Sequence, residues 1–143
     1  MEEIQIFLDT DVVISAILSK TGASFELTKN SFLRKTISKT VKQEIEEVVR
    51  RLKINISEAR RVLRNIKVVS LNIGKIDILK NYKKYVFDEE DAHVVAGAHK
   101  LRSRFLLSHN LKHYRVDKIK SDLKIIVEKP GYFLQYLRSL DES

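Results

Sequence analysis

The chain has 143 residues, of which 43% are hydrophobic and 32% are charged, a balance typical of a folded domain rather than a disordered chain. No apolar run is long enough to cross a bilayer, and the lack of cysteine excludes disulfides and thiolate metal sites, so we expect a cytoplasmic protein without membrane contact. The net charge of +8 favours a polyanionic partner such as nucleic acid.

The N-terminal part of the chain predicts two strands and two helices. The segment Glu3–Asp9 is almost continuously apolar, which is typical of a strand buried on both faces of a sheet. Val12–Leu18 has helical character, and a turn separates it from a second expected helix at Ser24–Leu33. Arg34–Ser38 is expected to form a second strand.

The middle of the chain predicts two helices and a strand. Thr40 is a favourable N-cap for a helix at Val41–Leu52, where apolar residues recur at helical spacing. Ser57 is expected to cap a following helix, and Lys67–Asn72 has the composition of a third strand.

The C-terminal half continues the alternation. A helix is expected at Ile73–Tyr85, and the acidic start of Asp88–Leu101 suits the N-terminus of another. Strands are expected at Arg104–Ser108 and Leu123–Glu128, and a last helix runs from Pro130 to the end of the chain.

Strands that alternate with helices predict right-handed βαβ units, and therefore a parallel sheet with helices on both faces. No repeat or linker interrupts the pattern, so we expect a single domain over residues 1–143. Functional groups in such sheets gather at the carboxyl ends of the strands, which is where Asp9 stands.

Four polar residues are poorly explained by simple solvation. Asp9 and Asn110 each follow an expected strand, Glu44 flanks the apolar face of its helix, and Asp91 opens a run of small and apolar residues. If the three carboxylates met above the sheet they would repel one another unless a cation lay between them. Hard divalent cations such as Mg²⁺ or Mn²⁺ prefer such oxygen ligands, and they can acidify a bound water for attack on a phosphate.

Each of these residues also has a purely structural interpretation. Asp9 could cap the helix that follows it, and Asp11 could complement the helix dipole or support the site. Glu44 could lie on a solvated helix face, and Asp91 could belong to a capping pair with Asp88. Asn110 alone is a typical turn residue.

The order and spacing of these residues resemble the PIN-domain family of nucleases, of the VapC-like toxin ribonuclease type. The similarity extends over nearly the whole chain. The segments that carry it are "IFLDTDVVISAIL", "SKTVKQEIEEVV", "DEEDAHVVAGAHK", "FLLSHNLKHY" and "VEKPGYFLQYL".

The resemblance implies a three-layer α/β/α fold with a central, mainly parallel five-stranded sheet. It implies that Asp9, Glu44 and Asp91 bind the metal, that Asn110 completes the catalytic set, and that Ser108 supports it. Asp11 stands where the family usually has Asn, and Asn110 stands where many active members have Asp. The first change adds negative charge, and the second weakens a second metal site.

The resemblance further implies cleavage of single-stranded RNA with Mg²⁺ or Mn²⁺. Small members of the family act as toxins, so an antitoxin partner and a homodimer are expected. A PIN-like module that binds RNA or protein without cleaving is the alternative, and Asn110 favours it. A different Mg²⁺-dependent hydrolase is less well supported, because the chain has no phosphate-binding Gly-rich loop.

Basic and aromatic residues offer further candidates. Arg50 and Arg51 belong to a basic stretch that could track RNA or form a solvated helix face. His113 and His109 lie near the proposed site and are candidates for substrate contact. Tyr82 and Tyr85 lie among lysines, where base stacking and core packing are both open, and core packing is the expected role.

Overall fold

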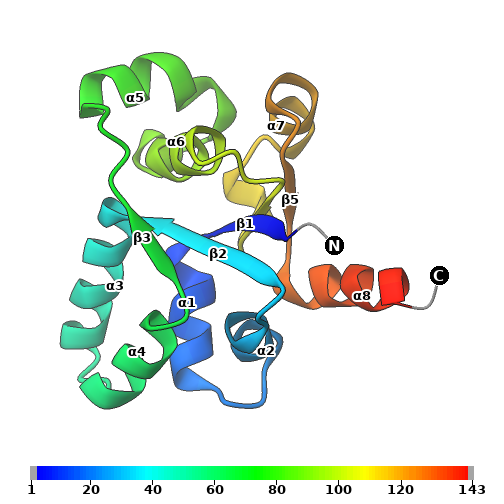
Figure 1. Cartoon of the computed structure of the whole chain (residues 1–143). Coiled ribbons are helices and arrows are strands. Elements are labelled where there is room, and N and C mark those ends of the chain that lie inside the picture. The colour runs from blue at the N-terminus through cyan, green and yellow to red at the C-terminus, as the bar shows by residue number, and fades with distance from the viewer. Residues whose placement is uncertain (1–2, 142–143) are drawn as a thin grey trace.

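The protein is described here from a computed structural model that places residues 3–141. Its core is a five-stranded, fully parallel sheet with strand order β3-β2-β1-β4-β5 (Figure 1). The strands are β1 (Ile4–Leu8), β2 (Leu33–Ser38), β3 (Lys67–Val69), β4 (Phe105–Leu107) and β5 (Ile126–Glu128). The predicted α/β class and parallel sheet are confirmed.

Helices cover both faces of the sheet and give the predicted three layers (Figure 1). One layer contains α1 (Thr10–Leu18), α2 (Ala23–Lys29), α3 (Lys39–Arg51), α4 (Ile56–Leu63) and α8 (Pro130–Asp141). The other contains α5 (Lys75–Tyr82), α6 (Ala92–Lys100) and α7 (Val116–Leu123). Short 3-10 turns occur at Lys83–Tyr85 (η1), Glu89–Asp91 (η2) and Leu111–His113 (η3). Among residues 3–141, none of the helices has the length and apolarity that a membrane span requires.

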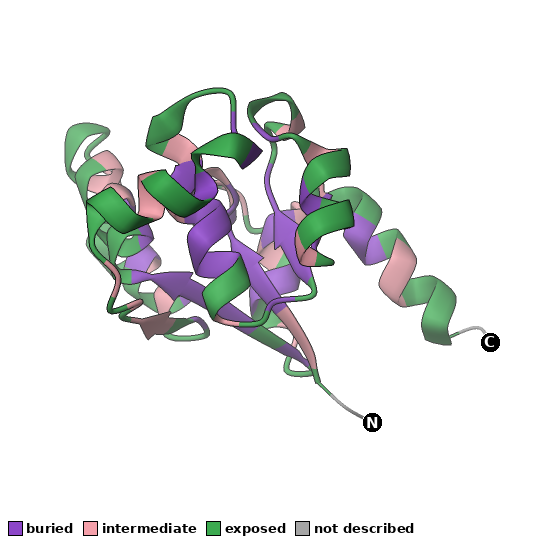
Figure 2. Ribbon diagram, turned by 90° about the horizontal axis from the view of Figure 1, so that it is seen from above, coloured by how far each residue is buried: buried purple, intermediate pink, exposed green. Residues whose placement is uncertain are grey.

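Helix α6 packs closely against β1. Ile6, Phe7 and Leu8 are fully buried, and Figure 2 shows the strands buried between helices whose outer faces are exposed. The α6 backbone approaches β1 closely at Gly97, where an added Cβ would lie 2.5 Å from Cζ of Phe7. The small residues of this helix therefore fix how near Asp91, which precedes it, lies to the sheet.

Two predicted helix caps are wrong. Ser38, not Thr40, caps α3, because its hydroxyl accepts a hydrogen bond from Val41 N at 3.2 Å. Asn55, not Ser57, caps α4, and its Oδ1 accepts from Ser57 N at 2.8 Å. Both true caps lie two residues earlier, so each helix begins two residues before the start that apolar periodicity indicated.

The predicted helix Ser24–Leu33 is too long. Helix α2 ends at Lys29, and Leu33 already belongs to β2. The buried Nζ of Lys35 donates to the carbonyl oxygens of Thr28 and Asn30 at 2.7 and 2.8 Å, which satisfies the carbonyls at the end of the helix. This contact is tertiary, since it comes from the adjacent strand.

The C-terminal half differs from the prediction mainly at α7. This helix was not expected, and Leu123 ends it instead of beginning a strand. Lys124 stops the helix in a left-handed conformation with φ of 59°, a position that usually has Gly. Helix α5 is shorter than expected, and the segment before α6 is the 3-10 turn η2.

Candidate active site

The carboxyl ends of β1 and β4 lie side by side at the centre of the sheet. The chain runs from β1 towards β2 on one side and returns at β4 on the other, so this is the point where the strand order reverses. Asp9 N donates to Leu107 O at 3.0 Å, which holds the residues after the two strands together. The residues predicted after these strands therefore do meet.

Asp9 is both a helix cap and a pocket residue. Its Oδ1 accepts from Thr10 N at 2.8 Å at the start of α1. Its Oδ2 accepts from the Ser108 hydroxyl at 2.9 Å and from the Tyr114 hydroxyl at 2.6 Å. Burial, together with the Asp9 charge, raises the pKa of Tyr114 far above its usual range, so this hydroxyl stays protonated and donates.

Asp11 holds the loop after β4. Its carboxylate accepts from the amide nitrogen of Asn110 at 2.8 Å and from His109 N at 3.2 Å. Burial and the nearby Asp9 raise the pKa of Asp11. Asp11 and Asn110, the two residues that depart from the family pattern, therefore contact each other: the added carboxylate accepts a hydrogen bond from the neutral side-chain amide.

Glu44 reaches the pocket from α3. Its Oε1 accepts from the Thr10 hydroxyl at 2.7 Å, and its Oε2 lies 3.2 Å from Nε2 of His93. An ionised carboxylate only accepts, so Nε2 of His93 carries the proton in this contact. Burial works to raise the pKa of Glu44, but these two hydrogen bonds outweigh it and the pKa is lowered.

Asp91 lies opposite Asp9, at the start of α6. Asp88 serves as the cap of η2, since its carboxylate accepts from Glu90 N at 2.9 Å, while the Asp91 side chain makes no capping bond. Oδ2 of Asp91 lies 3.7 Å from Nδ1 of His113. Burial is the main cause that raises the pKa of Asp91; His113 opposes it, and the negative charge of Asp9 adds to it.

These groups line one pocket of about 520 Å³ above the carboxyl end of the sheet. Of the predicted site residues, the pocket brings together Asp9, Asp11, Glu44, Arg51, Asp91, Asn110 and His113. Ser108 is buried beneath it, where its hydroxyl contacts Asp9. The ring of His109 instead contacts the Ser24 hydroxyl through Nε2 at 3.1 Å.

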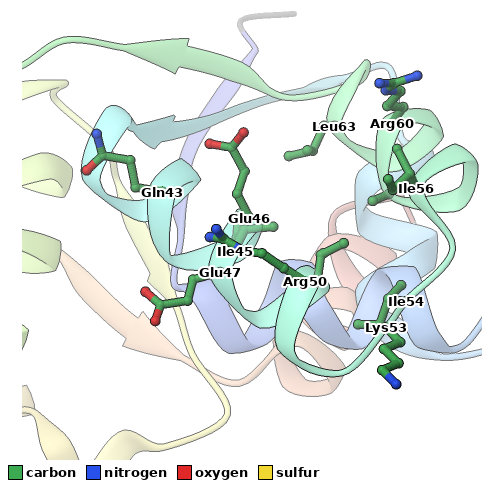
Figure 3. A pocket seen from close by; sticks show the side chains of 12 residues that line it. Gln43, Ile45, Glu46, Glu47, Arg50, Lys53, Ile54, Ile56, Arg60 and Leu63 are labelled. Atoms are coloured by element: carbon green, nitrogen blue, oxygen red, sulfur yellow. The ribbon is translucent and has the colours of Figure 1, made fainter.

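Arg50 lies elsewhere. It lines a separate groove of about 890 Å³ between α3 and α4, where Ile45, Ile54 and Leu63 form an apolar floor (Figure 3). None of the three predicted metal-binding carboxylates lines this groove. The adjacent residues Arg50 and Arg51 therefore face different surfaces.

Comparison with known proteins identifies the family and the fold of this chain. A sequence profile of the PIN domain matches residues 5–112, which is most of the chain. The chain belongs to the PIN domain family. Members of this family are nucleases. No curated protein matches the sequence significantly.

Solved structures share the fold of this PIN domain at low sequence identity. VapBC2 from Rickettsia felis, bound to a DNA fragment from its promoter, superposes with a TM-score of 0.65 and 17% identity over 88% of this chain and 98% of that one. A toxin–antitoxin complex from Klebsiella pneumoniae superposes with a TM-score of 0.60 and 15% identity, over 87% of this chain and 97% of that one. FitAcB from Neisseria gonorrhoeae superposes with a TM-score of 0.60 and 15% identity, over 88% of this chain and 98% of that one.

The donor set of this PIN domain suits a hard divalent cation. Within residues 3–141, no three acidic or histidine side chains are close enough together to enclose an ion. Mg²⁺ does not need such a cage, because it keeps several waters and is usually bound through one or two carboxylates. The raised pKa of Asp91 is consistent with a cation site. Without a cation the ionised form of Asp91 is disfavoured, and a bound cation would favour it.

Three residues that contact the acidic side chains of the site were not predicted as site residues: Thr10, His93 and Tyr114. Thr10 directly follows Asp9, and Tyr114 is the aromatic residue of the "FLLSHNLKHY" segment, so both had a sequence signal. His93 follows Asp91 by two residues, but only the tertiary structure, which brings the start of α6 close to α3, places its ring at Glu44. Nδ1 of His93 is buried without a hydrogen-bond partner in the described chain.

Proposed function

We propose that this PIN domain is a cytoplasmic endoribonuclease that hydrolyses single-stranded RNA with Mg²⁺ or Mn²⁺. The observation that carries the proposal is the meeting of Asp9, Glu44 and Asp91 in one pocket, although they come from three separate segments. The net charge of +8 supports a polyanionic substrate, because basic surface groups hold a phosphate backbone.

The side chains of the site have three roles: binding the metal, orienting the substrate or water, and fixing the metal-binding carboxylates. Asp9, Glu44 and Asp91 would hold the ion, and Asn110 would orient a water or the scissile phosphate. Ser108 and Tyr114 fix the orientation of Asp9, and Thr10 and His93 fix that of Glu44. Partners of this kind change metal affinity or activity by about 10- to 100-fold when removed.

A bound divalent ion supplies charge neutralisation at the phosphate and lowers the pKa of a coordinated water. Hydrolysis by water would not use the 2′-hydroxyl of RNA, so products with 5′-phosphate and 3′-hydroxyl ends are expected. Arg51 and His113, which line the same pocket, are placed to contact the substrate backbone.

Cleavage of a labelled single-stranded RNA tests the proposal. The wild type is assayed with Mn²⁺ and with EDTA, beside Asp91→Asn and Glu44→Gln. EDTA should abolish cleavage, and each variant should lose activity by at least about 100-fold. Glu46→Gln is the matched control, because Glu46 is on the same helix and faces the α3–α4 groove instead of the pocket.

The outcomes separate the alternatives. Cleavage that persists in EDTA or in Asp91→Asn contradicts the metal-dependent mechanism. RNA binding without cleavage by the wild type identifies the catalytically inactive module instead. Cleavage of a DNA strand of the same sequence at an equal rate contradicts RNA specificity.

We further propose that the protein is the toxin of a toxin–antitoxin pair and forms a homodimer. The support is the shared fold with chains from the toxin–antitoxin complexes of K. pneumoniae and R. felis. Light scattering of the purified protein gives the oligomeric state. Growth arrest on expression of the wild type, absent with Asp91→Asn, is the expected sign of a toxin.

A further inference from the structure

A second, basic surface lies next to the acidic pocket. It is a hollow of about 980 Å³ on the side of η1 and α7, and Lys83, Lys84, Arg115 and Lys118 line it. Asp88 and Glu89 also line it, but the carboxylate of Asp88 is engaged by Glu90 N. The four cations outnumber the two carboxylates, so the hollow favours an anion.

An exposed aromatic ring stands in this basic hollow. The Phe87 side chain is 64% exposed, and the guanidinium of Arg115 lies over its ring, with Cζ 4.4 Å from the centroid. Tyr82 and Tyr85, in contrast, are buried, as expected from their packing in the core. Phe87 is thus the aromatic group that this basic segment presents to solvent.

The cations here contact aromatic rings more than carboxylates: Lys84 Nζ lies 5.5 Å from the centroid of the Tyr85 ring, and Arg115 lies over Phe87. In the described range 3–141, Lys83, Lys84 and Arg115 form no salt bridge with a carboxylate, while Lys118 pairs with Asp122 at 3.5 Å. Unpaired lysine and arginine beside an exposed ring are the combination that binds single-stranded nucleic acid, because every base offers a stacking face and every nucleotide a phosphate.

The backbone connects this hollow directly to the acidic pocket. Val86 and Tyr114 form an antiparallel bridge, flanked by hydrogen bonds from Phe87 N to His113 O at 3.2 Å and from Arg115 N to Tyr85 O at 2.9 Å. In this register Phe87 is opposite His113. His113 lines the acidic pocket, and the Tyr114 hydroxyl holds Asp9, so both sites share one rigid pair of segments.

We infer that Phe87 and Arg115 form a nucleotide-binding subsite for the single-stranded RNA whose backbone is cut in the acidic pocket. A base stacks on the Phe87 ring and the Arg115 guanidinium contacts a phosphate, while Lys83 and Lys84 hold the neighbouring backbone. His113 lies between the two sites. The inference rests on the proposed function only in taking single-stranded RNA as the substrate.

Binding in EDTA isolates this subsite from cleavage. The probe is a fluorescein-labelled single-stranded RNA of about 12 nucleotides, followed by anisotropy. Phe87→Ala should weaken binding by about 10-fold, and Phe87→Tyr, which keeps a ring, should restore most of the loss. Arg115→Ala should also weaken binding and should lower the slope of log affinity against log salt by about 0.7, the value for one phosphate contact.

Phe32→Ala is the matched control, since Phe32 is another exposed phenylalanine, at 73%, and lines neither the pocket nor the hollow. It should bind like the wild type. A series of RNAs with one abasic nucleotide adds a test for stacking: one position should weaken wild-type binding and leave Phe87→Ala unaffected.

The outcomes keep the two proposals apart. Phe87-dependent binding by a protein that does not cleave supports the subsite and contradicts the nuclease. Normal metal-dependent cleavage together with unchanged RNA affinity of Phe87→Ala and Arg115→Ala overturns the subsite, and it would assign the exposed ring to a protein partner instead.

Discussion

The carboxylates of Asp9 and Asp91 line the same pocket, but their hydrogen-bonding environments differ. Asp9 accepts three hydrogen bonds, from Thr10 N and from the hydroxyls of Ser108 and Tyr114. Asp91 accepts none from the described residues, and its nearest polar partner is His113 Nδ1 at 3.7 Å. The fold fixes the Asp9 carboxylate with three hydrogen bonds, whereas Asp91 has only the longer contact with His113.

In this pocket Asp9 also has a structural role, as a helix cap, whereas the Asp91 side chain has none of this kind. Asp9 stabilises the start of α1 while it faces the pocket, because a strand end and a helix start coincide there. Asp91 is spared the capping role, which Asp88 takes. A half-buried carboxylate that accepts no hydrogen bond from the described residues is the one that gains most from a bound cation.

Gly97→Ala should have the largest effect on this arrangement. The new Cβ would lie 2.5 Å from the Phe7 ring, so α6 would have to move away from β1 and carry Asp91 with it. We expect a loss of about 2–3 kcal/mol in the free energy of unfolding, measured with urea. Gly131→Ala is the control, since no atom lies within 4 Å of its added Cβ, and an equal loss there would contradict the packing argument.

Asp9→Asn should destabilise the protein by about 2 kcal/mol, because an amide nitrogen then faces hydrogen-bond donors on one side of the side chain. Relief of the repulsion between Asp9 and Asp91 offsets only part of this loss. Urea denaturation in EDTA measures it. A rise in stability would show that repulsion outweighs the hydrogen bonds.

Tyr114→Phe removes one donor to Asp9 and keeps the buried ring. A loss of about 1.5 kcal/mol in unfolding free energy is expected, together with a loss of Mn²⁺ affinity of about 10-fold, because the orientation of Asp9 is no longer fixed. Calorimetric Mn²⁺ titration follows the second effect. Unchanged affinity would mean that Thr10 N and Ser108 suffice to orient Asp9.

Asp91→Asn should have the smallest effect on the free energy of unfolding. Unlike the other substitutions it should stabilise the protein, by about 0.5 kcal/mol near neutral pH. Because the pKa of Asp91 is raised from 3.8, the native state binds the proton more tightly than the unfolded chain does. Asp91 therefore makes the wild type more stable as pH falls from neutral through the raised pKa towards 3.8. The variant should lack this part of the pH dependence, which melting curves across that range would show.

Sequence patterns predicted the fold well where they were local and repeated. The apolar run ending at Leu8 and the small-residue run from Ala92 gave the central strand and the helix packed on it. The true caps of α3 and α4 and the whole of α7 were missed, because their signals are weak or contradictory. Lys124 ends α7 in a left-handed conformation, which its residue type does not indicate.

The sequence predicted most of the acidic residues that line the pocket, but not their contacts. The rule for parallel sheets placed Asp9 and Asn110 at one edge, and the structure places them there. The contact of Asp11 with Asn110 spans 99 positions, and that of Glu44 with His93 spans 49. Nothing local in the sequence specifies either pair.

The amino-acid sequence by itself determined the alternation of strands and helices, the net charge and the identity of the acidic residues. These depend on periodicity and residue type, which are local properties. Only the tertiary structure decided that Tyr114 holds Asp9, that Asp91 has only the longer contact with His113, and that Phe87 rather than a tyrosine faces solvent among the cations. Those facts depend on how α6 and the segments around Val86 and Tyr114 pack, because packing brings distant residues within hydrogen-bond distance.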